Sequence, residues 1–282
     1  MEFRTKVNIP RPDYSIAPCE RMLLVGSCFA DNLGRRFADY QFRATVNPYG
    51  VMYNPASILH TVTRFLAERP ADRPAVVFLT LGTNHVYVEK ATGEIVDNCR
   101  KRPQRLFDER QLDVDACLGY LSQAVGLLLE RNPQVKVTVT VSPIRYAKYG
   151  FHESQLSKAT LLLAADRLVS ERECCSYFPA YEIVNDELRD YRFYADDMLH
   201  PSAQAVDYIW EIIHDHLLSD EARAFVREWE PLRRALQHRP FHPESEEYKA
   251  FMDKTMLKIA ELSEKYPTFA WESSQAEREE QR

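Results

Sequence analysis

Several polar residues stand directly after short apolar segments, and their types are those of a nucleophile, a base and an orienting acid. Ser27 and Cys28 follow the apolar residues 21–25 and open a predicted helix. A hydroxyl or thiol at such a turn lies beside backbone N–H groups that can hold an oxyanion. Asp197 and His200 are three residues apart, so both side chains can converge from one turn and the carboxylate can orient the imidazole. Together these residues predict nucleophilic catalysis.

Other polar residues and glycines occupy equivalent places. Gly82 and Asn84 follow a second apolar segment, Arg145 follows a third, and Gly50 closes a turn. The carboxyl ends of parallel strands meet at one edge of a sheet, so these residues are expected near the nucleophile. Taken alone, each has a simpler interpretation, because a Ser-Cys pair is commonly a helix cap with a packed thiol and Asn84 a turn former. Their joint placement favours chemistry.

No metal site or nucleotide loop is predicted. His214 and His216 lie two residues apart on a predicted helix and therefore face different sides. His238 and His242 lack matching ligands in the sequence. The chain also has no glycine-rich phosphate loop of the P-loop or dinucleotide type.

Strands and helices are expected to alternate, which predicts an α/β fold with a parallel sheet and helices on both faces. Short apolar runs ending at glycine or turn residues indicate buried strands. The expected strands are 21–25, 75–81, 135–141 and a short one within 178–184, with a hairpin at 86–88 and 94–96. The expected helices are 30–40, 55–66, 113–131, 154–172 and 202–218, the second capped by Asn54 with Pro55 at its first position.

The composition changes after residue 219, which divides the chain into an α/β domain (1–219) and a helical extension (220–282). Charged helices are expected at 221–237 and 244–265. They carry apolar residues at helical spacing: Phe225, Trp229, Leu232, Phe251, Met256 and Ile259. We expect them to pack on the α/β domain or to join two subunits into an oligomer. The polar residues 273–282 are expected to fray.

Composition narrows the class of protein. The 282 residues are 45% hydrophobic and carry a net charge of −6, which argues against nucleic acid as a partner despite the arginine-rich stretch 100–105. No apolar run reaches the roughly 20 residues that span a bilayer, and the N-terminus lacks the pattern of a secretory signal. The six cysteines form no CxxC pair. We therefore expect a cytoplasmic protein with reduced thiols and no membrane partner.

Longer strings carry a family resemblance. The order G-x-[S/C], turn glycine, G-x-N and D-x-x-H resembles the SGNH/GDSL hydrolases. The chain also resembles the GSCFA family in the strings GSCFA (26–30), NPYG (47–50), YNP (53–55), NC (98–99), SPIR (142–145), QLSKAT (155–160) and YADDMLHP (194–201). The resemblance spans roughly residues 20–215. It implies a three-layer α/β/α sandwich and a nucleophile–His–Asp site.

The resemblance leaves two residues competing as nucleophile. Aligning Gly26 with the glycine of the GDSL motif places Ser27 on its aspartate and Cys28 on its serine, which favours Cys28. In the rival interpretation Ser27 attacks and Cys28 is a packed neighbour. His200 is then the general base with Asp197 as its orienting partner, although Asp196 could take that role.

The resemblance also assigns oxyanion donors and a reaction class. It implies that Gly50, through its backbone N–H, and Asn84, through its side-chain amide, hold the oxyanion beside Gly82, while Arg145 could bind a substrate carboxylate or phosphate. The expected function is an ester hydrolase or O-acyltransferase working through an acyl-enzyme, with acylated carbohydrate as one candidate substrate. Hydrolysis needs no cofactor, whereas a transferase could use an acyl-CoA donor. The alternative is a non-catalytic binding or scaffold protein on the same fold.

Overall fold

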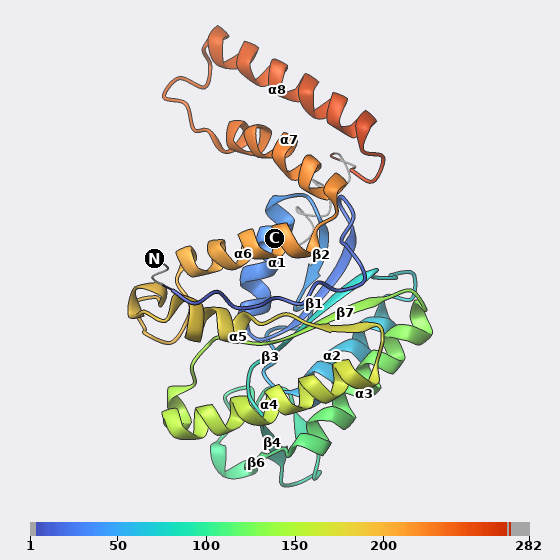
Figure 1. Ribbon diagram of the computed structural model, residues 1–282, viewed down its shortest axis with the longest axis vertical. Helices are drawn as coiled ribbons and strands as arrows, with labels where there is room; N and C mark the ends of the chain where they lie inside the picture. The colour runs from blue at the N-terminus through green and yellow to red at the C-terminus, as the bar shows by residue number, and fades with distance from the viewer. Residues whose placement is uncertain (1–3, 270, 272–282) are drawn as a thin grey trace.

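A five-stranded parallel sheet forms the centre of the computed structural model, which describes residues 4–269 and 271 (Figure 1). The strand order is β2-β1-β3-β7-β8, and every neighbouring pair is parallel. The strands are β1 (Arg21–Gly26), β2 (Arg43–Val46), β3 (Val76–Leu81), β7 (Lys136–Val141) and β8 (Cys175–Tyr177). All five therefore end at one side of the sheet, here called the carboxyl edge, and begin at the opposite side, the amino edge.

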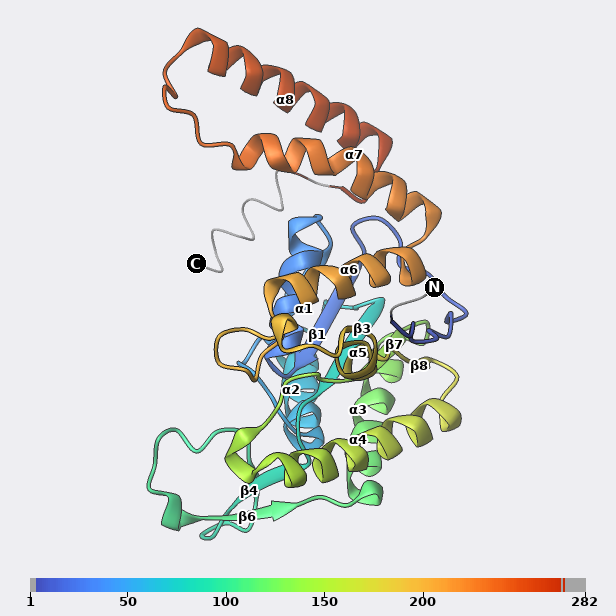
Figure 2. The ribbon, with the colours of Figure 1, turned by 60° about the vertical axis from the view of Figure 1, so that its left-hand side comes forward.

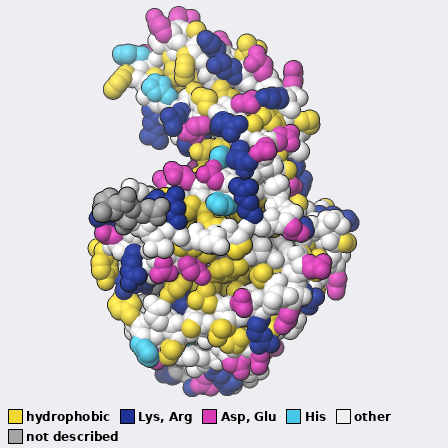
Figure 3. Space-filling view, in the orientation of Figure 1, with side chains coloured by type: hydrophobic (Ala, Val, Ile, Leu, Met, Phe, Trp, Pro, Cys, Tyr) yellow, Lys and Arg dark blue, Asp and Glu magenta, His cyan; other side chains and the backbone are white. Residues whose placement is uncertain are grey.

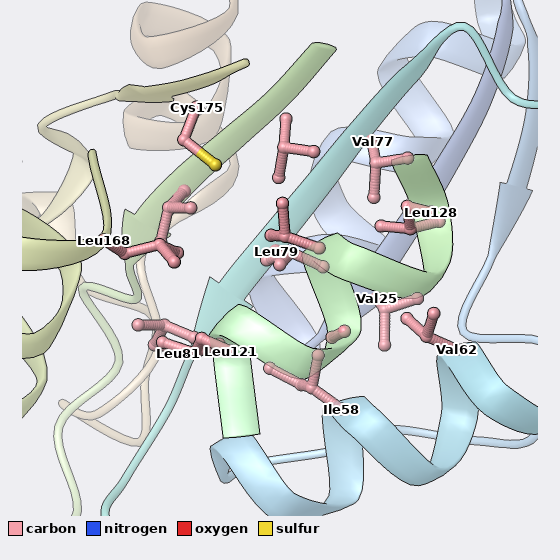
Figure 4. Packing of buried hydrophobic residues seen from close by; sticks show 14 of the residues in the cluster. Val25, Ile58, Val62, Val77, Leu79, Leu81, Leu121, Leu128, Leu168 and Cys175 are labelled. Carbon is pink, nitrogen blue, oxygen red and sulfur yellow. The ribbon is translucent and has the colours of Figure 1, made fainter. Parts of the chain in front are cut away.

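Helices cover both faces of this sheet (Figures 1 and 2). One face packs against α2 (Pro55–Glu68), α3 (Val114–Arg131) and α4 (Phe151–Glu171), and the other against α1 (Cys28–Asp39) and α6 (Ala203–Leu217). Successive strand residues alternate between the faces: Leu23 and Leu79 join the first cluster, and Leu24 and Phe78 join the second. Figure 4 shows the first cluster, with side chains of β1 and β3 facing those of α2, α3 and α4. The three-layer α/β/α sandwich predicted from the sequence is confirmed.

A second, antiparallel sheet is inserted between β3 and α3. Its order is β5-β4-β6, built from β4 (His85–Glu89), β5 (Ile95–Val96) and β6 (Phe107–Gln111), with a short 3₁₀ turn, η1 (Gln104–Leu106), before β6. The hairpin of β4 and β5 confirms the sequence prediction. Because β4 starts shortly after β3 ends, this small sheet begins at the carboxyl edge.

Side-chain caps fix where the helices begin. Asn54 accepts a hydrogen bond from the backbone N–H of Ser57 and Pro55 follows it, as predicted for α2. Ser27 caps α1 and Ser202 caps α6 in the same way. Both of these caps lie in turns at the carboxyl edge, so the local sequence that starts each helix also shapes the candidate site.

The structure departs from the sequence prediction after β7. The prediction of a strand within 178–184 is wrong, because the last strand, β8, ends before residue 178. The chain then forms α5 (Ala180–Glu182), a π-helical turn η3 (Ile183–Leu188) and a 3₁₀ turn η4 (Tyr191–Phe193). Pro179 accounts for part of this difference, because it has no N–H to donate to a ladder. The half-buried strand β2 was not expected either.

The C-terminal helices α7 (Asp220–Gln237) and α8 (Glu246–Lys265) form a hairpin that projects beyond the amino edge (Figure 1). The indole N–H of Trp229 donates to the carbonyl of Asp39, 2.8 Å away, at the end of α1. Phe225, Trp229 and Leu232 are buried, as expected, along with Ile259. Phe251 and Met256 are 42% and 43% exposed, so in this single chain they do not pack on the α/β domain. Their packing against a second subunit stays a prediction.

Two further features bear on the class of protein. Among the described residues, no helix combines the length and apolar character needed to cross a membrane. All six cysteines are free thiols. The surface of the C-terminal hairpin mixes charged side chains of both signs with exposed hydrophobic ones (Figure 3). The expected fraying of 273–282 concerns residues outside the described part of the chain.

Candidate active site

The turn of residues 26–28 connects β1 to α1 and requires glycine at its first position. Gly26 has φ of +141°, and a Cβ atom there would lie 2.1 Å from the carbonyl oxygen of Thr80. The N–H of Gly26 donates to Oδ1 of Asn47 at 2.9 Å, and the N–H of Ser27 donates to the carbonyl of Thr80 at 3.0 Å. The turn is therefore bonded to both strands that flank β1.

Ser27 and Cys28 occupy very different environments. Ser27 is completely buried, its hydroxyl lies 3.2 Å from Thr80 Oγ1, and it accepts a hydrogen bond from the N–H of Phe29. Cys28 is the first residue of α1 and is partly exposed. Its Sγ lies 3.6 Å from the hydroxyl of Tyr53. Of the two candidate nucleophiles, Ser27 is fully buried and engaged as a helix cap, whereas Cys28 is only partly buried and packs against the core cluster of α1 and α6.

Tyr53 links the thiol to the next strand. Burial and the hydrogen bond with Cys28 raise the pKa of the Tyr53 hydroxyl to about 12, so it keeps its proton at neutral pH and can donate to the sulfur. The carbonyl of Tyr53 accepts from the N–H groups of Gly82 and Thr83, at 2.9 and 2.8 Å, directly after β3. The sequence placed Tyr53 in a family string but gave no reason to expect it beside the thiol.

The turn of residues 197–200 brings the predicted base and acid together. His200 Nδ1 lies 2.6 Å from Oδ2 of Asp197, while Oδ1 accepts from the N–H groups of Leu199 and His200. These hydrogen bonds lower the pKa of the Asp197 carboxyl to about 2. The two side chains are 42% and 46% exposed. Asp196 is exposed and pairs with no described residue, so the geometry supports Asp197 over Asp196 as the orienting group.

Arg145 holds this turn against the end of β7. Its backbone N–H donates to the carbonyl of Leu199 and its guanidinium to the carbonyl of Met198, both at 3.0 Å. The guanidinium also lies over the ring of Phe151, 4.1 Å from the centroid. The sequence offered Arg145 as a substrate ligand, whereas in this structure its contacts are those of a support for the turn.

The two predicted oxyanion donors are partly engaged elsewhere. The N–H of Gly50, which has φ of +96°, donates to the carbonyl of Asn47 at 2.8 Å. Asn84 is 2% exposed, and its side-chain amide donates to the carbonyl of Leu112 at 2.7 Å. The first N–H of α1, that of Cys28, has no acceptor within its own helix and stands next to the sulfur. The roles of Gly50 and Asn84 stay predictions.

The sequence did not identify the aromatic and cationic side chains behind the strand ends. Tyr146 packs edge-on against Tyr53 with ring centroids 5.9 Å apart, and its hydroxyl is buried without a partner among the described residues. Lys158 of α4 is buried and bonds to the carbonyl of Gly82. Lys158 stands in a family string on an amphipathic helix, where a lysine is usually solvated. No group of three or more potential metal ligands exists among the described residues.

The carboxyl edge therefore has two halves. Cys28 follows β1 and Arg145 follows β7, and only β3 separates these strands, so the backbones of the two halves are roughly 10 Å apart at the usual strand spacing. No hydrogen bond joins the Cys28 thiol to the His200 ring in the described part of the chain. One half offers a thiol at a helix N-terminus, and the other a histidine held by a carboxylate. These groups suit acyl transfer through a covalent intermediate.

Comparison with solved structures finds proteins of low sequence identity. One is described as a platelet activating factor from Streptococcus pneumonia, with 15% identity and a TM-score of 0.49, covering 71% of this chain and 84% of that one. A GDSL-like lipase from Bacteroides thetaiotaomicron has 15% identity and a TM-score of 0.45, covering 74% and 89%. A catalytic mutant of an acetylxylan esterase from Geobacillus stearothermophilus has 15% identity and a TM-score of 0.44, covering 76% and 95%.

Among curated proteins no significant match is found. Family models are more specific. The GSCFA family model matches residues 21–74 and 68–212, which include both halves of the site. The model of the GSCFA domain protein, C-terminal domain, matches residues 229–281, from within α7 onward. Since these matches extend over most of the sequence, the chain belongs to the GSCFA family.

Proposed function

We propose that this protein hydrolyses an ester or transfers its acyl group to another hydroxyl, through a thioester on Cys28. The observation that carries the proposal is the contrast between the two adjacent residues: Cys28 is partly exposed at a helix N-terminus, while the Ser27 hydroxyl is buried as a cap. Backbone N–H groups at a helix N-terminus can also hold an oxyanion that forms next to the sulfur. His200, hydrogen-bonded to Asp197 at the same edge, supplies the base.

The reaction would proceed in two displacements. The side chains of Cys28 and His200 have to come into contact when the substrate binds. His200 Nε2 then takes the proton from Cys28 Sγ as the sulfur attacks the acyl carbonyl, and the ester C–O bond breaks with its oxygen receiving that proton from His200. Water or an acceptor hydroxyl then loses a proton to His200 and attacks the thioester carbonyl, and the sulfur recovers the proton as the C–S bond breaks. Asp197 keeps Nδ1 protonated and stabilises the imidazolium. Tyr53 can donate to the sulfur when it is a thiolate.

A polar cavity beside Gly50 supports a hydroxyl-rich substrate group, such as an acylated carbohydrate. Its volume is about 600 Å³, and it is walled by α2, the loop after β2 and the segment after β5. Donors and acceptors alternate in its lining, where His60 lies 2.8 Å from Asp97 and three guanidinium groups accompany Asn98. The polar and aromatic lining residues are Tyr49, His60, Arg64, Asp97, Asn98, Arg100 and Arg102. Planar polar side chains beside an aromatic ring suit sugar hydroxyls and ring faces.

Hydrolysis by this route needs no cofactor, whereas transfer needs an acyl donor, and an acyl-CoA would serve. A thioester favours transfer because it can be passed to an acceptor when water is kept out. The six free thiols support a reducing compartment such as the cytoplasm.

The test uses the whole chain and two independent readouts. We expect p-nitrophenyl acetate to be turned over by the wild type and not by Cys28→Ala, and iodoacetamide to label Cys28 faster than the other thiols. His200→Ala should slow both reactions. Cys174→Ala, which removes another partly buried thiol, is the matched control and should behave as wild type. Absence of turnover with several acyl esters, together with slow labelling of Cys28, would favour a non-catalytic binding protein.

A further inference from the structure

Lys158 is a buried cation with no carboxylate partner among the described residues. It is 2% exposed, and its Nζ donates to two backbone carbonyls, those of Gly82 and Ser142, each at 2.7 Å. The rings of Tyr146 and Tyr181 face the ammonium group at 5.1 and 6.0 Å from their centroids. Gly82 directly follows β3 and Ser142 directly follows β7, so one nitrogen atom joins the ends of two adjacent central strands.

Burying this group has a cost. An ammonium ion loses several kcal/mol of hydration on burial, and carbonyl dipoles compensate it less well than a carboxylate does. Burial accordingly lowers the pKa of Lys158 to about 7. An apolar side chain of similar size on α4 would fill the same space without that cost. Lysine can make both hydrogen bonds in either protonation state, because the protonated amine has three N–H groups and the neutral amine has two.

The carbonyl group that belongs to Gly82 is connected to the Cys28 thiol through Tyr53. The N–H groups of Gly82 and Thr83 both donate to the carbonyl of Tyr53, and the hydroxyl of Tyr53 lies 3.6 Å from the sulfur of Cys28. A displacement of Gly82 would therefore move Tyr53 and its contact with the thiol.

The carbonyl group that belongs to Ser142 is connected to His200 through the segment that ends at Arg145. The hydroxyl of Ser142 accepts the N–H of Ile144, and the next residue, Arg145, donates from its backbone and its guanidinium to the turn that carries His200. A displacement of Ser142 would therefore shift the turn of residues 197–200 relative to β7.

Neighbouring side chains on the same face of α4 bind one loop each. Ser154 Oγ accepts the N–H of Tyr146 after β7, and Ser157 Oγ accepts the N–H of Asn84 after β3. Lys158 differs from both, because it alone on this face bonds to both strand ends. Ser157 and Lys158 lie three and four residues after Ser154, which places all three on one side of the helix.

We propose that Lys158 is a positioning residue that fixes the spacing between the ends of β3 and β7, and with it the spacing between Cys28 and His200. The inference rests on the proposed function for its effect on turnover. The geometric part of the proposal is that one side chain sets the separation of the two halves of the site. It can be tested without an ester substrate, by measuring how fast the Cys28 thiol is alkylated.

The test compares Lys158→Met with wild type in the full-length protein. Methionine keeps most of the side-chain volume but removes the charge and the donors. We expect a folded protein with kcat for p-nitrophenyl acetate lowered about 10- to 100-fold and KM nearly unchanged, since misplacing a reacting group by about 1 Å has effects of this size. Alkylation of Cys28 by iodoacetamide should slow, because His200 no longer takes its proton efficiently. Lys136→Met, at the amino end of β7, is the matched control and should match wild type.

The second variant is Lys158→Arg, which keeps the positive charge and the N–H donors but places the donors at different positions. We expect kcat and Cys28 alkylation between those of wild type and Lys158→Met, with near-UV circular dichroism unchanged. If Lys158→Met does not fold, wild-type alkylation in Lys158→Arg overturns the proposal. Wild-type kcat and alkylation in folded Lys158→Met overturn it as well, and leave Lys158 a packing residue. If the wild type turns over no ester but the variants still slow alkylation, the proposed function fails while the positioning role stands.

Discussion

The two edges of the central sheet are built from different chemistry. At the carboxyl edge, turns rich in hydrogen bonds leave Cys28 partly exposed and the side chains of Asp197 and His200 nearly half exposed. At the amino edge, the C-terminal hairpin closes the sheet domain with aromatic packing, in which Phe225 and Trp229 are at most 1% exposed. Substitutions at the first edge should therefore change activity and leave stability nearly intact, and those at the second should do the reverse.

Trp229→Ala at the amino edge should have the largest effect. It removes a buried indole together with its hydrogen bond to Asp39, so the free energy of unfolding should fall by about 3–5 kcal/mol. Urea denaturation measures the loss, and turnover per folded molecule should not change. Met256→Ala, on the exposed face of α8, should alter stability by less than about 0.5 kcal/mol. A tail that is not docked would give Trp229→Ala the same small effect.

Asp197→Asn tests the opposite edge. Asparagine retains an oxygen for the N–H groups of Leu199 and His200 but cannot hold the imidazolium, so we expect turnover to fall about 100- to 1,000-fold, or roughly 3–4 kcal/mol. The melting temperature should stay within about 2 °C, since the turn is exposed. Because the pKa of Asp197 is about 2, its ionisation should not contribute to the activity profile between pH 4 and 9. A comparable loss in Asp196→Asn alone would assign the orienting role to that residue.

Lys158 should be an exception to the contrast between the two edges. It lies at the carboxyl edge, yet its substitution should change stability as well as activity. Its pKa is about 7 in the folded protein and that of an ordinary lysine in the unfolded chain, so the unfolded state binds more protons between these values. Wild type should therefore gain stability relative to Lys158→Met as the pH rises from 7 to 10, by up to about 1.4 kcal/mol per pH unit. Denaturation at pH 7, 8 and 9 measures the difference, and parallel curves for the two proteins would contradict it.

Ser27→Ala should produce the smallest change. It removes the cap of α1 and the contact with Thr80, which together stabilise the fold by about 1 kcal/mol. We expect more than half of the turnover to remain, because the buried hydroxyl is not the reacting group. Complete loss of turnover in folded Ser27→Ala, with full activity in Cys28→Ala, would move the nucleophile to Ser27.

Local sequence was sufficient to predict the central elements of the fold. Strands β1 and β3 consist mostly of large apolar residues, and β7 alternates valine and threonine after its first residue. All three are buried on both faces, and the cap at Asn54 marks the start of α2. It was insufficient for β2 and β8. Both are short strands at the sides of the sheet, and β8 contributes only three residues, so pairing with a neighbour decides their conformation. The apolar residues after Pro179 were read as that strand, but they pack beneath α6 in helical turns.

The same distinction applies to the site. Cys28, Asp197 and His200 could be named from spacing, because a short turn places a histidine and an aspartate together whatever surrounds them. The engagement of the Asn84 amide with Leu112 and the burial of Lys158 could not be predicted, since both depend on contacts between distant segments. On an isolated helix a lysine extends into water, and only the packing of α4 against the strand ends encloses it.

The two halves of the site also lie far apart along the chain, and this separation orders events during synthesis. Cys28 leaves the ribosome roughly 170 residues before His200, a delay of about 10–30 s at 5–20 residues per second. Through that interval the nascent chain carries the thiol without its base, and β7 and α6 must form before the histidine can reach it. In the proposed mechanism the nucleophile is thus made early and activated only when nearly the whole α/β domain has folded, which spares the growing chain from premature acylation.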